Sequence, residues 1–215
     1  MSNGLSIREQ IAKRIAEDLH EGYIVNLGIG IPVMVSNFVS KEKEIIYHSE
    51  QGVLGMGSAA SEEEADPDLI NASKEPVTLV SGGSFSHSAD SFAMTRGRHI
   101  DVAVLGGMQV SEKGDLANWK VKGAELGSIG GAMDISIGAK KLYIAMTHTT
   151  KDGQPKIVKE LDYAVTALNC VDRIYTDMAV IDVTKEGLVL REVSPGYTVD
   201  DVQKATEPKL IVSLL

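Results

Sequence analysis

Short apolar runs followed by glycine recur along the first half of this chain, and they limit its fold more than any other feature. Residues 23–27 lead into a turn with two glycines at 28–31, and residues 44–48 lead into the glycine-rich stretch 49–57. Upstream, apolar residues recur every four positions, which predicts one buried helix face: Ile7, Ile11, Ile15 and Leu19. The order helix, strand, glycine turn, helix, strand, glycine turn is typical of a parallel α/β sheet.

Further elements are expected on similar grounds. Ser6 and Glu9 have the spacing of a capping box, Gly22 marks the stop of the first helix, and Pro32 suits the start of a helix at 32–40. The remaining patterns predict strands at 77–81, 100–105 and 142–146, a small-residue helix after the glycine cluster 127–131, a hairpin of 178–183 with 187–192, a helix from 198 and a last strand at 210–214. The predicted fold is α/β, an open and largely parallel sheet flanked by helices, in a single domain over residues 1–215.

Glu50 is the leading catalytic candidate. It lies in the stretch Ser49-Glu50-Gln51-Gly52, directly after an apolar run of β type. Ligands of open α/β sheets bind beyond the carboxyl ends of the strands, so this position favours chemistry. Because the reference pKa of a glutamate is about 4.3, such a side chain is an anionic nucleophile at pH 7 without help from a base. Gly52, Gly55 and Gly57 are expected to permit a sharp turn and the close approach of a ligand.

The turn that contains Gly28 and Gly30 superficially resembles a dinucleotide-binding loop. Val33 occupies the third glycine position, and Glu44 begins its strand instead of ending it. A Rossmann NAD site is therefore not expected. Two interpretations remain open: backbone N–H groups that contact an oxyanion or phosphate at a helix start, or a turn that only packs a helix on the sheet.

The composition argues against several kinds of partner. The formal net charge of −9 disfavours nucleic-acid and anionic-membrane surfaces. An anionic ligand must therefore be held by backbone amides, a few placed cations or a partner subunit. Cys170 is the single cysteine, which excludes an internal disulfide and fits a reducing compartment. No stretch has the features of a signal peptide or of a bilayer span, so we expect a cytoplasmic protein.

Other chemical sites find little support in the sequence. The five histidines show no metal-ligand spacing, and one cysteine cannot complete a zinc cluster, so no metal site is expected. His48 and His87 either line a pocket or are structural. The basic run 95–99 either contacts phosphate or ends a solvated helix, and Lys120 and Lys122 are candidates for contacts with an anionic cofactor.

A series of motifs along the chain occurs in the order typical of one known family. They are NLGIGIP (26–32), SEQGVLGMG (49–57), SFAMTRGRHID (91–101), VLGGMQVSEKGDLANW (104–119), GGAMDISIGAKK (130–141), HTTKDGQPKI (148–157), DMAVIDV (177–183) and GLVLREVSPGYTVDDV (187–202). Over essentially its whole length the chain resembles the β subunit of the 3-oxoacid, or acetoacetate-type, CoA transferases. The resemblance implies an α/β fold shared with sugar-phosphate isomerases.

The resemblance also implies roles for particular residues. The family's glutamate nucleophile falls on Glu50, and its backbone oxyanion contact falls on Gly130 and Gly131. Gly28 and Gly30 are assigned to the same oxyanion or CoA contacts. Coenzyme A is then a substrate, and no permanently bound cofactor is implied. An α subunit that shares the CoA site would complete a heterodimer or an α₂β₂ complex.

Two departures from the family pattern concern specificity. Gln51 replaces the usual Asn of the Ser-Glu-Asn-Gly motif, and residues 120–129 lack the proline-containing, lysine-rich segment typical of acetoacetate enzymes. Gln51 and Gln109 are candidate pocket residues. The sequence does not decide which acid and acyl-CoA are exchanged.

The implied reaction is a ping-pong transfer of CoA between an acyl-CoA and a carboxylic or 3-oxo carboxylic acid, through a glutamyl-CoA thioester on Glu50. Two alternatives share the fold. One is a sugar-phosphate isomerase-like enzyme, which would turn over a phosphosugar without CoA. The other is a ligand-binding subunit that has lost the chemistry, and the intact Glu50 and glycines count against it.

Overall fold

The computed structural model describes residues 4–121 and 123–214. The helices are α1 (Ile7–Glu17), the 3₁₀ helix η1 (Pro32–Asn37), α2 (Ser88–Arg96), α3 (Ala132–Gly138) and α4 (Val199–Lys204). The main sheet contains β1 (Ile24–Leu27), β2 (Ile46–Ser49), β3 (Val53–Ala59), β4 (Val77–Phe85), β5 (Val102–Gly106), β8 (Lys141–Ala145), β10 (Arg173–Tyr175), β11 (Ala179–Thr184), β12 (Gly187–Val193) and β13 (Ile211–Val212). A small sheet contains β6 (Gln109–Ser111), β7 (Leu116–Ala117) and β9 (Ile157–Val158).

The main sheet is parallel at its centre and antiparallel toward its edges. Its ten strands run in the order β13-β12-β11-β10-β8-β5-β1-β2-β3-β4. The five central strands from β10 to β2 are all parallel, whereas β3 and β4 pair antiparallel on one side and β11 and β12 on the other. This mixed sheet with helices on its faces confirms the predicted α/β class.

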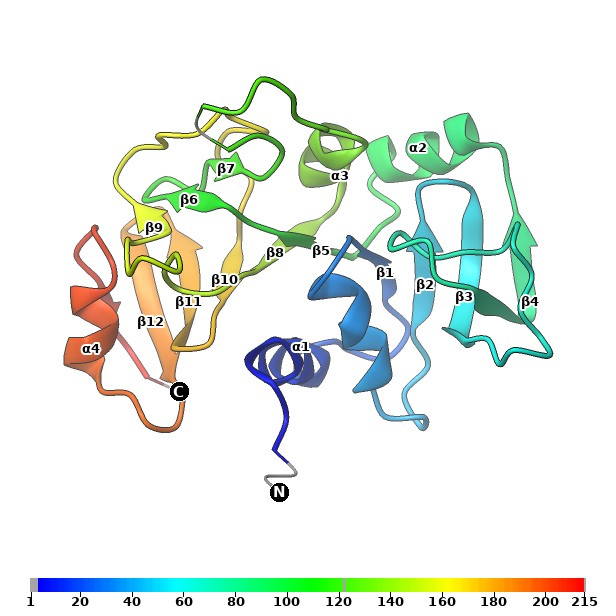
Figure 1. The fold of residues 1–215 in the computed structure, drawn as a ribbon, viewed down its shortest axis with the longest axis horizontal. Coiled ribbons are helices and arrows are strands. Elements are labelled where there is room, and N and C mark those ends of the chain that lie inside the picture. The colour runs from blue at the N-terminus through cyan, green and yellow to red at the C-terminus, as the bar shows by residue number, and fades with distance from the viewer. Residues whose placement is uncertain (1–3, 122, 215) are drawn as a thin grey trace.

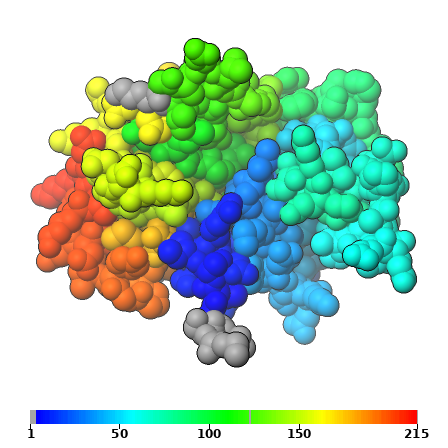
Figure 2. Space-filling view, in the orientation of Figure 1, coloured from blue at the N-terminus to red at the C-terminus, as the bar shows by residue number. Residues whose placement is uncertain are grey.

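Both faces of the sheet centre are buried, as the near-continuous apolar strands require. Along β5, Val102 and Val104 belong to the hydrophobic cluster beneath α1, while Ala103 and Leu105 belong to the cluster on the opposite face. Figure 1 shows α1 on one side of the central strands and α3 with the small sheet on the other. In Figure 2 the blue N-terminal part lies at the middle of the face shown, between the orange and red C-terminal part and the cyan part.

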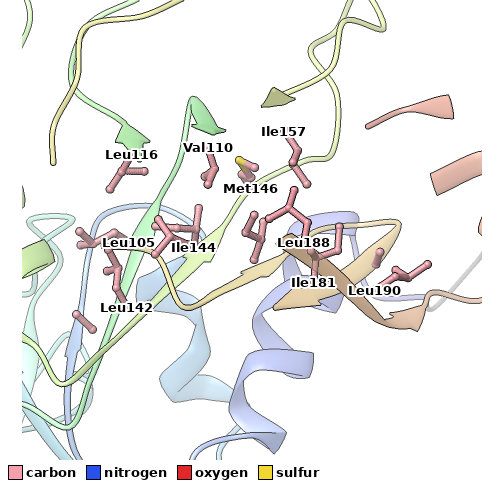
Figure 3. Close-up of a cluster of buried hydrophobic side chains, with 14 of the residues drawn as sticks. Leu105, Val110, Leu116, Leu142, Ile144, Met146, Ile157, Ile181, Leu188 and Leu190 are labelled. Carbon is pink, nitrogen blue, oxygen red and sulfur yellow. The ribbon is translucent and has the colours of Figure 1, made fainter. Parts of the chain in front are cut away.

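The small sheet packs its apolar side against the main sheet. Val110, Leu116 and Ile157 are fully buried, and Figure 3 shows these side chains facing Ile144 and Leu188 of the main sheet. Burial of such side chains stabilises the fold by about 1.5–3 kcal/mol each. The core therefore fixes where the three short strands of the small sheet begin and end.

Several predicted elements are confirmed. Ser6 and Glu9 form the capping box at the start of α1, β11 and β12 form the expected hairpin, and Thr198 caps α4. The segment after Pro32 is a short 3₁₀ helix that ends at Asn37, not an α-helix to Ser40.

The expectation for two glycines of the 49–57 stretch was wrong. Gly55 and Gly57 lie within β3, not in a ligand-binding turn. A Cβ on Gly55 would lie 2.9 Å from Gly83 Cα, and one on Gly57 would lie 2.3 Å from Thr78 Oγ1. These glycines therefore permit the close approach of β3 to β4. The expected strand 77–81 likewise continues through Gly82 and Gly83 to Phe85.

Candidate active site

A cavity of about 490 Å³ lies beyond the carboxyl ends of the parallel strands. Strands β1, β2, β5 and β8 end at the same edge of the sheet, and the residues that follow them form much of the wall: Gly28–Ile31, Glu50, Gly106–Met108 and Met146–Thr147. The start of α3 and residues beside the small sheet complete it. This is the position expected for a ligand site in a parallel α/β sheet.

Glu50 is carried by a tight hairpin loop between β2 and β3. The N–H of Gly52 donates to the carbonyl of Ser49 at 3.0 Å, which closes the turn. Gly52 has a φ of 120°, and a Cβ there would lie 2.2 Å from the carbonyl oxygen of Ser86. Only glycine fits at this position, because a side chain would meet backbone. The loop therefore holds the Glu50 side chain at the cavity in a defined place.

A buried amide group orients the Glu50 carboxylate. Asn26, at the end of β1, is fully buried. Its Nδ2 donates to Glu50 Oε2 at 3.2 Å and also lies 3.2 Å from His48 Nδ1. A carboxylate accepts hydrogen bonds but cannot donate them, so the amide nitrogen must face Glu50. One carboxylate oxygen is thereby held by a hydrogen bond, and the other stays available for attack.

The hydrogen bonds behind Asn26 have one consistent direction. His48 Nδ1 accepts from Asn26, so the proton of the neutral ring is on Nε2, which lies 2.7 Å from Ser91 Oγ. Ser91 Oγ donates in turn to the carbonyl of Ser49 at 3.1 Å. Burial lowers the pKa of His48, although the nearby charge of Glu50 opposes this shift. His48 is thus a neutral, buried positioning residue and does not line the cavity.

The four candidate glycines all line the cavity, but their backbone donors differ. The N–H of Gly28 already donates to the carbonyl of Val104 at 2.9 Å. Gly30 and Gly130 have φ values of 88° and 50°, a region that glycine adopts readily. The N–H groups of Gly130 and Gly131 donate to no other residue among those that the structure describes. Gly130 and Gly131 therefore have free donors at the cavity, and Gly28 does not.

Gly131 is also required for packing. A Cβ there would lie 2.8 Å from the ring of Phe92 on α2. The contact between α2 and the start of α3 is thus close enough to exclude a larger side chain without movement of Phe92.

The two glutamine candidates lie elsewhere. Gln51 donates through Nε2 to the carbonyl of Ile70 and lines a separate, smaller cavity, so its side chain faces away from Glu50. Gln109 is buried, and its Oε1 accepts hydrogen bonds from the N–H groups of Asp162 and Tyr163. Gln109 is not part of the wall around Glu50, because it anchors the loop after β9.

The cations in the cavity wall are Arg8 and Lys156, and the sequence patterns pointed to neither. Lys156 lies within the motif 148–157, but only the fold brings it within reach of β8. The lysine candidates near the small sheet have other positions: Lys120 Nζ donates to the carbonyl of Glu125, and Lys122 lies outside the described residues. In the basic run, Arg96 pairs with Asp134 at 2.7 Å on the surface.

Neither a metal cluster nor a membrane-spanning helix accompanies this cavity in the described residues. Within residues 4–121 and 123–214, no group of three or more His, Cys, Asp or Glu side chains is arranged to hold a metal ion. None of the helices in that part of the chain combines the length and the apolar character needed to cross a bilayer.

The motifs that surround the cavity match one family of enzymes. The model of the coenzyme A transferase family matches residues 8–205. The chain belongs to the coenzyme A transferase family. The resemblance inferred from the motifs is thereby confirmed, and the chain is a CoA transferase.

The relatives of this CoA transferase chain cover it almost completely. It is 48% identical to a 3-oxoadipate CoA-transferase subunit of Acinetobacter baylyi, over 95% of this chain and 94% of that protein. It is 47% identical to a succinyl-CoA:3-ketoacid coenzyme A transferase subunit of Helicobacter pylori, over 97% and 100%. The solved acyl-CoA transferase YdiF of Escherichia coli O157:H7 shares the fold, with a TM-score of 0.80 at 22% identity. All of this chain is covered in that comparison, but it spans 44% of the YdiF chain.

Proposed function

We propose that this chain is the β subunit of a CoA transferase that carries CoA as a glutamyl thioester on Glu50. The observation that carries the proposal is the position of Glu50, at the end of a parallel strand, in a cavity, with one carboxylate oxygen hydrogen-bonded to Asn26. Coenzyme A enters as a substrate, and the reaction exchanges one thioester for another without a bound cofactor.

The first half-reaction uses the free oxygen of Glu50 as a nucleophile. This oxygen attacks the carbonyl carbon of the donor acyl-CoA, the C–S bond breaks, and CoA leaves as a thiolate. The product is a mixed anhydride between Glu50 and the donor acid. Because carboxylates are weak nucleophiles, orientation must supply much of the rate, and oriented attack can contribute about 7–11 kcal/mol. The Asn26 hydrogen bond and the Gly52 turn both serve that orientation.

The thiolate then attacks the glutamyl carbonyl and expels the donor acid as a carboxylate. Glu50 is left as a CoA thioester, and an acceptor carboxylate reverses the two steps. No net proton transfer is needed. Each addition places negative charge on a carbonyl oxygen, where an N–H donor contributes about 3–4 kcal/mol. Asn26 Nδ2 is suited to the glutamyl oxygen, and the free N–H groups of Gly130 and Gly131 are suited to the oxygen of the substrate.

The proposal includes a separate α subunit. The relatives are named as single subunits of their enzymes, and the relative in Bacillus subtilis is named as the beta one. Arg8 and Lys156 are few cations for a polyanionic substrate in a chain with a net charge of −9. The phosphates of CoA would then be bound largely by the partner.

The cellular setting and the acids exchanged belong to the same proposal. We propose that the complex works in the cytoplasm. The exchanged acids would resemble those in the relatives' names, 3-oxoadipate and succinyl-CoA with a 3-keto acid.

A covalent test follows directly. The chain complexed with its α subunit is incubated with acyl-CoA and treated with borohydride, and peptide mass analysis should locate a reduced glutamyl group at residue 50. Glu50→Ala should abolish the modification, and Glu44→Ala, at the other end of the same strand region, should not. Glu50→Asp should lower turnover on the order of 10²-fold, because the nucleophile is drawn back. Modification that persists in Glu50→Ala would refute the assignment.

Assembly is tested separately. The purified chain, shown by mass to contain no partner, should have no transferase activity, and activity should appear on addition of the α subunit. Robust turnover by the chain alone would contradict the proposed division of the site.

A further inference from the structure

A partly buried ammonium group in the cavity wall has no carboxylate bonded to it. The contact found for Lys156 Nζ is with Thr147 Oγ1 at 3.5 Å, and Thr147 Oγ1 donates its own proton to the carbonyl of Thr149. Lys156 forms no salt bridge with any residue that the structure describes. Burial lowers the pKa of Lys156 to about 8, and the charge of Asp177 opposes this, so the group is cationic at pH 7. A cation in this setting needs an anion from outside the chain.

A free amide donor lies in the same wall. Asn118 Oδ1 accepts a hydrogen bond from Thr166 Oγ1 at 2.8 Å, while the N–H of Asn118 donates to the same hydroxyl at 3.1 Å. These two bonds fix the amide so that its oxygen is occupied. Asn118 Nδ2 donates to no other residue in the described part of the chain, and Asn118 lines the cavity.

The small sheet brings Lys156 and Asn118 to one end. Gln109 pairs with Ala117 across the antiparallel β6–β7 ladder, and Val110 pairs with Ile157 across the parallel β6–β9 ladder. Asn118 therefore leaves β7 at the same end where Lys156 enters β9, two strand spacings apart, or about 10 Å between backbones. Side chains of both residues line the cavity from that end. A cation and an amide donor together match the acceptor oxygens of a carboxylate.

We propose that Lys156 and Asn118 bind the distal carboxylate of a dicarboxylic acyl group, and so select dicarboxylic over monocarboxylic substrates. This inference rests on the proposed function, because Glu50 must hold the reacting end of the same acyl group. A six-carbon diacid places its carboxyl carbons about 6 Å apart, given C–C bonds of about 1.5 Å. That length fits a cavity equivalent to a sphere about 10 Å across.

The phosphates of CoA do not fit the same place. When the CoA sulfur is bonded to Glu50, the long pantetheine arm separates it from the nearest phosphate by more than the width of this cavity. The anion that reaches Lys156 while the thioester end lies at Glu50 is therefore part of the acyl group.

The decisive comparison uses succinyl-CoA and butyryl-CoA, which differ in a terminal carboxylate against a methyl group. The complex with the α subunit is assayed for formation of the enzyme–CoA thioester from each donor. In Lys156→Met the ratio of kcat/KM for succinyl-CoA to that for butyryl-CoA should fall about 10- to 100-fold, the size expected when a charged hydrogen bond is lost. Lys156→Arg should retain most of the ratio. Lys159→Met, on an exposed position, is the matched control and should leave the ratio unchanged.

A second variant tests the amide without removing volume. Asn118→Asp keeps an acceptor for Thr166 and replaces the Nδ2 donor by an oxygen, so it should also lower the ratio about tenfold or more. An equal fall with both donors, or an unchanged ratio in both variants, would overturn the proposal. Binding of free succinate and butyrate, followed by the shift in Tm of the complex, needs no chemistry at Glu50. Preferential binding of succinate that is lost in Lys156→Met would support the subsite even if no thioester formed.

Discussion

Removal of the Ser91 hydroxyl should unfold the chain more easily than its small volume suggests. Ser91 is fully buried and His48 is 1% exposed. Ser91 Oγ joins His48 Nε2 at 2.7 Å to the carbonyl of Ser49 at 3.1 Å. In Ser91→Ala both partners stay buried, the imidazole with an unpaired N–H and the carbonyl with one acceptor fewer. At about 1–3 kcal/mol for each buried polar group left without a partner, the loss should be about 2–5 kcal/mol.

Ser136→Ala provides a matched control on α3. Ser136 is also buried, at 4% exposure, but its Oγ has no hydrogen-bond partner. Removal of this hydroxyl leaves no new unsatisfied group, so the free energy of unfolding should change by less than about 0.5 kcal/mol. The two variants delete the same atom type from equally buried sites.

Urea unfolding of the full chain, followed by the fluorescence of the single tryptophan, Trp119, measures both changes. Thioester formation in the complex is a second readout, because looser packing of His48 should release Asn26 and lower the rate at Glu50. A loss of less than about 1 kcal/mol in Ser91→Ala, or a loss no larger than that of Ser136→Ala, would refute the role given to this hydroxyl.

Three further perturbations test other parts of the molecule. Gly52→Ala should cost more than about 2 kcal/mol in urea unfolding and nearly abolish thioester formation, because a positive φ is strained for alanine; a near-native variant would show that the turn is adaptable. His148 is fully buried with its pKa lowered by burial to about 4, so its contribution is present above about pH 6.5 and lost as the pH falls toward 4, on the order of 3 kcal/mol. Urea unfolding across that range should show a steeper loss in the wild type than in His148→Asn, and equal slopes would contradict it. Burial raises the pKa of the Cys170 thiol to about 12, so iodoacetamide at pH 8 should label the unfolded chain quickly and the native chain hardly at all; equal labelling of the two states would show that the thiol is accessible in the fold.

Local patterns in the sequence predicted most of the elements that follow local rules. The four-residue apolar period of α1, the capping box at Ser6 and the hairpin of β11 with β12 each depend on residues close together in the chain. The same patterns missed β6, β7, β9 and β10. These strands have only two or three residues each, which is too short for a visible alternation, and their pairing partners lie far away in the sequence.

Glycine was the least reliable signal. Gly52 does occupy a sharp turn, whereas Gly55 and Gly57 continue a strand. The chain around each is similar, and the difference lies in which backbone comes near. At Gly57 the neighbour is Thr78 of β4, a contact that no local pattern contains.

The order of residues along the chain was enough to identify the reactive side chain and the frame that presents it. Glu50 follows a strand and precedes a glycine turn, so its place at a carboxyl edge follows from chain order and the handedness of parallel α/β connections. What surrounds Glu50 became visible only in the folded chain. Asn26 reaches it because β1 and β2 are neighbours in register, and Lys156 and Asn118 meet because β6 pairs with both β7 and β9. Strand pairing joins residues without regard to their separation in sequence, so these contacts depend on the whole sheet.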